Sequence, residues 1–244
     1  MKLLFVDTSA KLANVFVTED GKLLAEGFDS GEKTHASMLL PVIDGALKDA
    51  GLGIKDVDVI GVVNGPGSYT GLRIAVACAK MLAYGAGKPL VTVNTLDFLA
   101  LSAAAKINEK GGGEGSGILA MLDARNTLCF YSLYEIKAGG EIVNITGVKS
   151  DYAADVAGIV KTAGYPENKL YLCGDGAAKN RELLAESFED ARFPEPGDMT
   201  GNHIGASKAV SLKLAEGEMT DFAPEKAAAD YYKEVHITLR SAEK

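Results

Sequence analysis

The chain has 244 residues, of which 47% are hydrophobic and 24% charged. This composition excludes intrinsic disorder and supplies a substantial core for one large domain or two small ones. The formal charge of -8 and the pI near 5.0 exclude a broad phosphate-binding surface, because neutralising a nucleic-acid backbone needs clustered lysine and arginine. We therefore expect any RNA to be held by a partner protein.

The sequence predicts a cytoplasmic protein that does not enter a membrane. No apolar stretch reaches the ~18 residues that a membrane span needs, and the apolar run at residues 3–7 is too short for a signal peptide. Cys78, Cys129 and Cys173 are widely spaced and lie in apolar runs, which is typical of reduced, buried thiols. We expect none of the three to be a nucleophile.

The first half of the chain predicts an α/β unit. Three short runs at residues 3–7, 14–18 and 23–28 predict an antiparallel meander. A helix is expected over residues 36–50, with Thr34 as its N-cap and a kink or a late start at Pro41. Alternating elements follow, which predicts parallel strands joined by crossover helices. They are a strand at 57–63, a helix at 70–86, a strand at 90–93 and a helix at 96–105.

The second half is predicted to repeat this element order. The glycine-rich residues 110–117 indicate a linker between domains or a loose loop. The elements expected after it are strands at 118–123, 128–136, 142–148 and 170–173, and helices at 152–163, 178–187 and 204–215. We therefore predict a duplicated α/β unit, with one lobe at 1–106, a second at 107–204, and residues 205–244 packing back on the first.

Three turns between a strand and a helix are candidate phosphate loops. Asp7, Thr8 and Ser9 end the first strand, where a carboxylate and hydroxyls can hold a metal-bound phosphate, although a turn-forming cap explains them better. Gly65 and Gly67 lie in a loop that could bring backbone N–H groups to an anion, or that could be a tight turn made rigid by proline with Thr70 as the helix cap.

Gly174 and Gly176 repeat this arrangement in the second half and are better explained as an ordinary helix-entry turn. None of these loops matches a P-loop or a dinucleotide fingerprint. The three histidines are isolated, and no Gly-x-Ser-x-Gly elbow occurs, so the sequence predicts neither a metal site nor a catalytic residue.

The helix at 70–86 is apolar on nearly every side, with Arg73 and Lys80 as its only charges. Such a helix is either enclosed within a large core or exposed on one face that meets another protein. In a domain of this size a core layer covers one face, so we favour an interface.

The sequence resembles the bacterial TsaB (YeaZ) family, non-catalytic paralogues of the TsaD/Kae1 carbamoyltransferases in the actin-like ATPase superfamily. The resemblance rests on three segments: Leu-Phe-Val-Asp-Thr-Ser at residues 4–9, Thr-His-Ala-Ser-Met-Leu-Leu-Pro at 34–41, and Gly-Pro-Gly-Ser-Tyr-Thr-Gly-Leu-Arg-Ile at 65–74. It implies a two-lobed actin-like (RNase H-like) α/β fold, in which mixed five-stranded sheets are flanked by helices.

The resemblance also implies a function. The family takes part in forming N6-threonylcarbamoyladenosine next to the anticodon of tRNAs that read codons starting with A. The expected role is a scaffold that is not itself catalytic, pairs with TsaD, supports binding of the ATPase TsaE, and meets tRNA only through the complex. No cofactor is required, and nucleotide binding at the candidate loops, as vestiges of an active ancestor, stays open.

Two early helices are the expected TsaD interface by this resemblance, and a homodimer could form through the same helices. The residues predicted to make the contact are Leu39, Val42, Ile43, Leu47, Leu72, Val76, Ala79 and Ala83. The competing interpretation is a stand-alone enzyme of the same superfamily, either an ATP-dependent kinase or ATPase or a peptidase.

Overall fold

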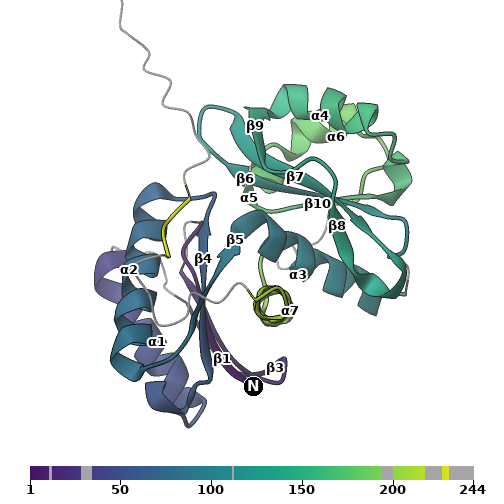
Figure 1. Ribbon diagram of the computed structural model, residues 1–244. Helices are drawn as coiled ribbons and strands as arrows, with labels where there is room; N and C mark the ends of the chain where they lie inside the picture. The colour runs from purple at the N-terminus through teal and green to yellow at the C-terminus, as the bar shows by residue number, and fades with distance from the viewer. Residues whose placement is uncertain (11–12, 29–34, 112, 194–199, 218–226, 231–244) are drawn as a thin grey trace, which may run out of the picture.

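The computed structural model describes residues 1–10, 13–28, 35–111, 113–193, 200–217 and 227–230. Two five-stranded mixed sheets, each flanked by helices, form two neighbouring lobes (Figure 1). The predicted N-cap Thr34 and the tail beyond residue 230 lie outside the described residues. Among the helices in these ranges, none combines the length and apolar character needed to cross a bilayer.

The first sheet has the strand order β3-β2-β1-β4-β5. Its strands are β1 (Lys2–Asp7), β2 (Asn14–Glu19), β3 (Lys22–Phe28), β4 (Val59–Gly65) and β5 (Leu90–Asn94). Strand β1 pairs antiparallel with β2 and parallel with β4, and β4 pairs parallel with β5. The predicted meander and parallel crossovers are thus confirmed, although the strand expected from residue 57 begins two residues later.

Helices cover both faces of the first sheet, which explains the continuous apolar run in its central strands. Along β1, Leu4 and Val6 pack toward α1 (His35–Asp49) and α2 (Tyr69–Ala86), while Leu3 and Phe5 pack toward α3 (Thr95–Glu109) and α7 (His203–Ala215). This alternation follows the period of two in a strand. Helix α1 starts at His35 and continues through Pro41, so the late start is not found.

The second sheet has the order β10-β6-β7-β8, with β9 also pairing with β7. Its strands are β6 (Gly117–Asp123), β7 (Leu128–Ile136), β8 (Ile142–Asn144), β9 (Lys149–Tyr152) and β10 (Leu170–Cys173). Three helices accompany them: α4 (Ala153–Thr162), α5 (Asp175–Lys179) and α6 (Arg181–Ser187). Short 3₁₀ turns occur at Ile54–Asp56 (η1), Ala138–Gly140 (η2) and Glu167–Lys169 (η3). The strand predicted at 142–148 is shorter, ending at Asn144, and a separate strand that was not predicted follows at Lys149–Tyr152. The helix predicted at 178–187 is divided between α5 and α6.

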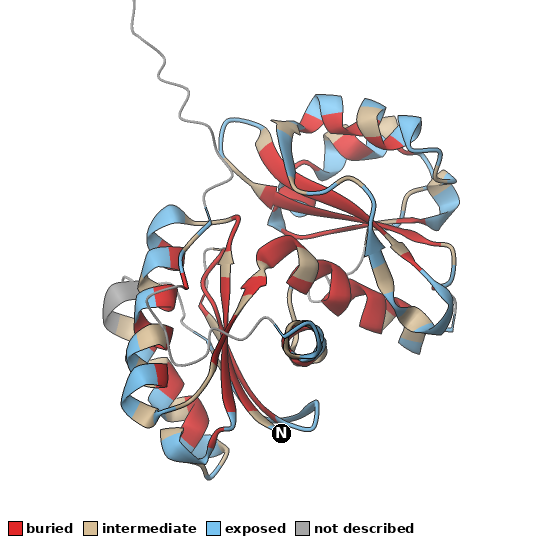
Figure 2. Ribbon diagram, in the orientation of Figure 1, coloured by how far each residue is buried: buried red, intermediate tan, exposed pale blue. Residues whose placement is uncertain are grey.

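Helix α3 is the structural joint between the lobes. Its Phe98 and Leu101 pack on the first sheet, while its Leu96 and Leu99 pack on the second. Figure 2 shows this helix as almost entirely buried between the two lobes. A helix in contact with both sheets needs apolar residues on more than one face, and α3 has them.

Of the two alternatives that the glycines after α3 predicted, a linker between domains or a loose loop, the described residues do not form a loose loop. Gly115 donates its N–H to the Ile136 carbonyl (2.9 Å), and Ile136 donates in turn to the Ser116 carbonyl (2.9 Å). Ser116 is 2% exposed. The described residues before β6 are therefore held against β7 by backbone hydrogen bonds, which composition alone does not reveal.

Two glycines allow a matched test of the packing on β4 and α2. A Cβ added to Gly61 would lie 2.7 Å from the Phe5 ring and 2.8 Å from Val210 Cγ2, whereas one added to Gly85 meets no atom within 4 Å. We expect Gly61→Ala to lower the free energy of unfolding by ~1–3 kcal/mol through overpacking. Gly85→Ala should raise it by ~0.5–1 kcal/mol, because alanine favours a helix. Urea denaturation measures both, and a stabilised Gly61→Ala protein would contradict this packing.

Candidate functional site

The Asp7 carboxylate in the turn after β1 is hydrogen-bonded by Ser9 of the same turn, while the buried Thr8 hydroxyl has no hydrogen-bond partner among the described residues. Asp7 is 4% exposed, and its Oδ1 accepts hydrogen bonds from the Ser9 backbone N–H (2.8 Å) and the Ser9 hydroxyl (2.6 Å). Burial raises the pKa of Asp7, and the hydrogen bonds from Ser9 partly offset that rise. The turn-forming interpretation of Asp7, Thr8 and Ser9 therefore accounts for the contacts of this carboxylate.

The glycine loop after β4 packs directly on that turn. Gly65 and Gly67 have φ values of +133° and +151°, which favour glycine. A Cβ on Gly67 would lie 2.7 Å from the Ser9 carbonyl oxygen, and one on Gly71 would collide with the Thr8 carbonyl. The Ser68 N–H donates to the Ser9 carbonyl (2.7 Å). The first two candidate segments are thus brought together by backbone contact, and these glycines are needed for that contact.

Ser68, not Thr70, is the N-cap of α2. Its Oγ accepts a hydrogen bond from the Gly71 N–H at 3.3 Å. The prediction of Thr70 as the cap was wrong because the helix begins one residue earlier, at Tyr69. Both side chains can cap a helix, so only the backbone path distinguishes them.

A C-terminal segment packs against the carboxyl end of β4 in the first lobe. Residues 227–230, the short yellow segment in Figure 1, lie beside β4. The Asp230 N–H donates to the Asn64 carbonyl (2.7 Å), and Asn64 Nδ2 donates to Asp230 Oδ2 (2.8 Å). A Cβ on Gly65 would collide with the Asp230 carbonyl oxygen. This glycine therefore makes room for the returning chain.

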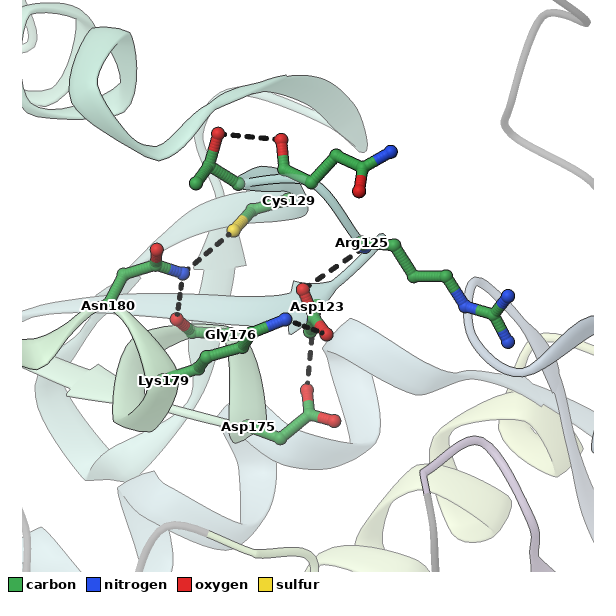
Figure 3. Close-up of polar contacts among 9 residues, drawn as sticks. Asp123, Arg125, Cys129, Asp175, Gly176, Lys179 and Asn180 are labelled. Carbon is green, nitrogen blue, oxygen red and sulfur yellow. Dashed lines mark hydrogen bonds and ion pairs between the residues drawn. The ribbon is translucent and has the colours of Figure 1, made fainter.

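The second-lobe loop has a comparable internal network (Figure 3). Asp175 Oδ1 accepts from the Asp123 N–H (3.0 Å), and Lys179 Nζ forms an ion pair with Asp123 Oδ2 (2.7 Å). A Cβ on Gly174 would collide with the Met121 carbonyl, and one on Gly176 would lie 2.8 Å from Leu122. Both glycines therefore allow close packing on β6.

Sequence reasoning missed Asp123, Lys179 and the hairpin between β6 and β7. Asp123 ends β6 as Asp7 ends β1, so the repeated element order was a signal that could have found it. Three consecutive residues of this hairpin, 125–127, have φ values of 71°, 53° and 63°. Such backbone is costly for residues other than glycine and is found near functional sites. The Arg125 N–H donates to Asp123 Oδ1 (3.1 Å), which holds the start of the turn.

The carboxylates of the first-lobe and second-lobe loops repel one another. Burial raises the pKa of Asp175, and the negative charges of Asp123 and Asp7 raise it further. A phosphate placed among these carboxylates would be repelled unless a cation came with it. No three histidine, cysteine, aspartate or glutamate side chains in the described ranges are grouped to hold a metal ion. The close packing of the chain therefore explains the glycines of these loops without a bound phosphate.

The three thiols are buried and weakly acidic. Burial raises the pKa of Cys129 to about 11 and that of Cys173 to about 12, and it raises the pKa of Cys78 as well. Cys129 Sγ accepts a hydrogen bond from Asn180 Nδ2 (3.5 Å), which also donates to the Gly176 carbonyl (2.8 Å). A nucleophilic cysteine needs a lowered pKa, so these thiols have a packing role.

The comparison with protein families decides the relationship. Residues 25–229 match the family model described as TsaD: tRNA N6-adenosine threonylcarbamoyltransferase. The chain belongs to this family.

Within it, the chain is similar to proteins named TsaB, and one of these matches extends over the full chain. It is 25% identical to the tRNA threonylcarbamoyladenosine biosynthesis protein TsaB of Bacillus subtilis, over 100% of this chain and 96% of that protein. It is 30% identical to the TsaB of Escherichia coli over 57% of this chain, and the match spans 58% of the E. coli protein. These matches confirm the predicted TsaB (YeaZ) relationship.

The fold is that of a solved relative, YeaZ from Pseudomonas aeruginosa. The two superpose with a TM-score of 0.72 at 22% identity, covering 94% of this chain and 99% of that one. The predicted fold class, a two-lobed actin-like arrangement of two mixed five-stranded sheets, is confirmed.

The residues predicted to contact TsaD are mostly core residues, which corrects the sequence analysis. Seven of the eight are buried, and Val42 is half-buried. The exposed fractions are 1% for Leu39, 2% for Ile43, 6% for Leu47, 1% for Leu72, 4% for Val76, 0% for Ala79 and 3% for Ala83. These side chains belong to the cores around the first sheet, so they do not reach a partner.

The opposite side of α2 carries its own exposed stripe, which we define as Arg73, Ala77, Met81 and Tyr84. All four residues are exposed, with Met81 at 73% and Tyr84 at 79%. Their spacing of three and four residues places them on one face of the helix. The Arg73 guanidinium stacks 4.1 Å above the Tyr69 ring beside it. Helix α2 thus has an exposed face with large apolar side chains, but it is formed by residues other than those predicted to contact TsaD.

Asp7 supplies a test of the first turn. The pKa of Asp7 is raised in the folded state, so the protonated carboxyl stabilises the fold. This stabilisation is present below the unfolded pKa of ~3.9 and is lost as pH rises through the folded pKa. Asp7→Asn keeps an oxygen acceptor without the charge. We expect the free energy of unfolding of Asp7→Asn, minus that of wild type, to be larger at about pH 7.5 than at about pH 4, as measured by urea denaturation. Asp190→Asn, at an exposed position, is the control, and an equal difference at both pH values would contradict the buried carboxylate.

Ala77 and Ala79 test which face of α2 is core. Ala79 is 0% exposed, whereas Ala77 is exposed. We expect Ala79→Glu to cost ~3–5 kcal/mol of unfolding free energy, since it buries an unpaired charge. Ala77→Glu should change it by less than ~0.5 kcal/mol. Thermal and urea denaturation give both values, and equal effects would mean that the helix is oriented differently.

Proposed function

We propose that this chain is a scaffold subunit in the cytoplasmic formation of N6-threonylcarbamoyladenosine next to the anticodon of tRNAs reading codons that start with A. It pairs with TsaD and supports the binding of TsaE, and it does not itself carry out the transfer. The observation that carries the pathway is the full-length similarity to TsaB of Bacillus subtilis.

The stripe on α2 supports docking to a protein partner. Met81 and Tyr84 are large apolar side chains that are mostly exposed, and exposed Leu40 (54%) lies on the neighbouring helix α1. Apolar and aromatic side chains with an arginine beside them are typical of interface centres. A Cβ at Gly85 would meet no atom, so a partner helix could approach closely there. We assign the TsaD contact to this stripe.

The candidate phosphate loops support a role without catalysis. Asp7 accepts hydrogen bonds from Ser9 and Asn14, and Asp123 pairs with Lys179 and accepts the Arg125 N–H. The role needs no cofactor, and nucleotide binding at Gly65, Gly67, Gly174 and Gly176 remains a prediction. The net charge of -8 supports an arrangement in which tRNA meets this chain only as part of the complex.

The test is a charge placed in the stripe. Met81→Glu should leave the fold unchanged and weaken TsaD binding by about 100-fold or more, because docking would desolvate the carboxylate. Ile145→Glu, at a position 43% exposed in the other lobe, is the control and should bind like wild type. The measurements are affinity for purified TsaD without added nucleotide, and tRNA modification by TsaD and TsaE with and without this chain.

Two results would contradict the proposal. Modification at full rate without this chain would remove its scaffold role, and ATP hydrolysis or peptide cleavage by the purified chain alone would favour a stand-alone enzyme. Sedimentation of the chain alone shows whether the stripe also forms a homodimer, which Met81→Glu should then disrupt.

A further inference from the structure

A cavity of about 230 Å³ lies where the two lobes meet, apart from the glycine loops. The first lobe contributes residues of β5, α3 and α7 to its walls, and the second contributes residues of β7 and β8. At ~30 Å³ per molecule it has room for about seven waters. It is smaller than the roughly 300–1,000 Å³ of sites for drug-sized ligands, so it suits a compact molecule.

One wall of the cavity centres on the carboxylate of Asp97. Tyr134, which is 1% exposed, donates its hydroxyl to Asp97 Oδ1 at 2.7 Å. The Asn144 side chain also hydrogen-bonds this carboxylate. Asn144 Oδ1 accepts from Ser132 Oγ (3.0 Å) and from the Gly147 N–H (2.7 Å), which leaves its amide nitrogen to serve Asp97. Asp97 is thus held in place by groups from the other lobe.

The charges in the cavity wall do not cancel. Lys213 Nζ lies 3.3 Å from Glu216 Oε2 at the end of α7, and the same ammonium also partly offsets the rise in the pKa of Asp97 that burial causes, so one cation serves two carboxylates. With the carboxylates of Asp97 and Glu216 and the single ammonium of Lys213, the cavity wall carries one net negative charge. Burial raises the pKa of Asp97, as expected for a carboxylate with little water around it. A cation entering the cavity would relieve this cost, while an anion would meet two carboxylates.

The remaining wall is apolar. Val93 is 1% exposed, and Leu101 and Ala209 are each 4% exposed, and all three line the cavity. Ile142 of β8 lines it from the second lobe. A carboxylate facing hydrocarbon across a small cavity suits a molecule that has a charged end and an apolar end.

We propose that this cavity binds a small organic cation: a primary ammonium compound with a short hydrocarbon chain. The ammonium donates to Asp97, and the chain lies against Val93, Leu101 and Ala209. Because both lobes contribute to the wall, the bound molecule bridges them. This site is independent of the role in tRNA modification, and either can fail without the other.

The experiment is a calorimetric titration of the full chain with three probes at equal ionic strength: n-butylammonium, methylammonium and butyrate. We expect saturable binding of n-butylammonium with a Kd on the order of 1 mM, clearly weaker binding of methylammonium, and no binding of butyrate. The order separates the contribution of the charge from that of the hydrocarbon chain. A heteronuclear NMR titration locates the perturbed residues.

Asp97→Asn keeps the acceptor for Tyr134 and removes the charge, so we expect at least about tenfold weaker binding of n-butylammonium. Glu182→Gln, an exposed residue of α6, is the matched control and should bind like wild type. Leu212→Trp is a second variant: Leu212 lines the cavity yet is 51% exposed, so the change should narrow the mouth without unfolding the chain. We expect it to weaken binding also.

Three results would overturn the site: no saturable binding of n-butylammonium to the wild-type chain, equal binding of butyrate, or unchanged affinity in both Asp97→Asn and Leu212→Trp. If Asp97→Asn fails to fold, the Leu212→Trp titration decides alone. Loss of cation binding with tRNA modification intact would separate this site from the proposed scaffold function.

Discussion

The close contact between the glycine loop and the turn after β1 is the constraint on which the first lobe depends. The Ser68 N–H donates to the Ser9 carbonyl, and a side chain at Gly67 or Gly71 would collide with the backbone of the facing turn. This contact determines where α2 begins. Glycine is required at these positions by the packing of two chain segments, whether or not a phosphate binds nearby. The glycines of this loop therefore have a role in folding that does not depend on a bound phosphate.

Because α2 starts at Tyr69, the helical period fixes which of its side chains point toward the sheet and which point away. Ala75, Val76 and Ala79 enter the core against the sheet, while Ala77 and Met81 point away from it. The same helix thus contributes to the core on one side and carries the proposed docking stripe on the other. Figure 2 shows this division, with buried segments of α2 turned toward the sheet and exposed segments turned outward.

Most elements could be predicted from the sequence, because their apolar periods and turn residues are local signals. The strands Leu128–Ile136 and Leu170–Cys173 were placed with the correct bounds. The face of α2 could not be predicted, because small apolar residues occur on both of its sides and leave little contrast between them. The network of Asp123, Asp175 and Lys179 joins residues 52 and 56 positions apart, so no local pattern shows it.

The two lobes contact each other through residues that lie far apart in the sequence. Helix α3 packs on both sheets, and its Asp97 accepts the hydroxyl of Tyr134 from β7 across the junction. The stripe on α2 lies on the outer face of the first sheet, whereas the cavity beside Asp97 lies among α3, α7 and the second sheet. The proposed docking stripe and the proposed ligand cavity lie on different surfaces, so changes on one face need not disturb the other.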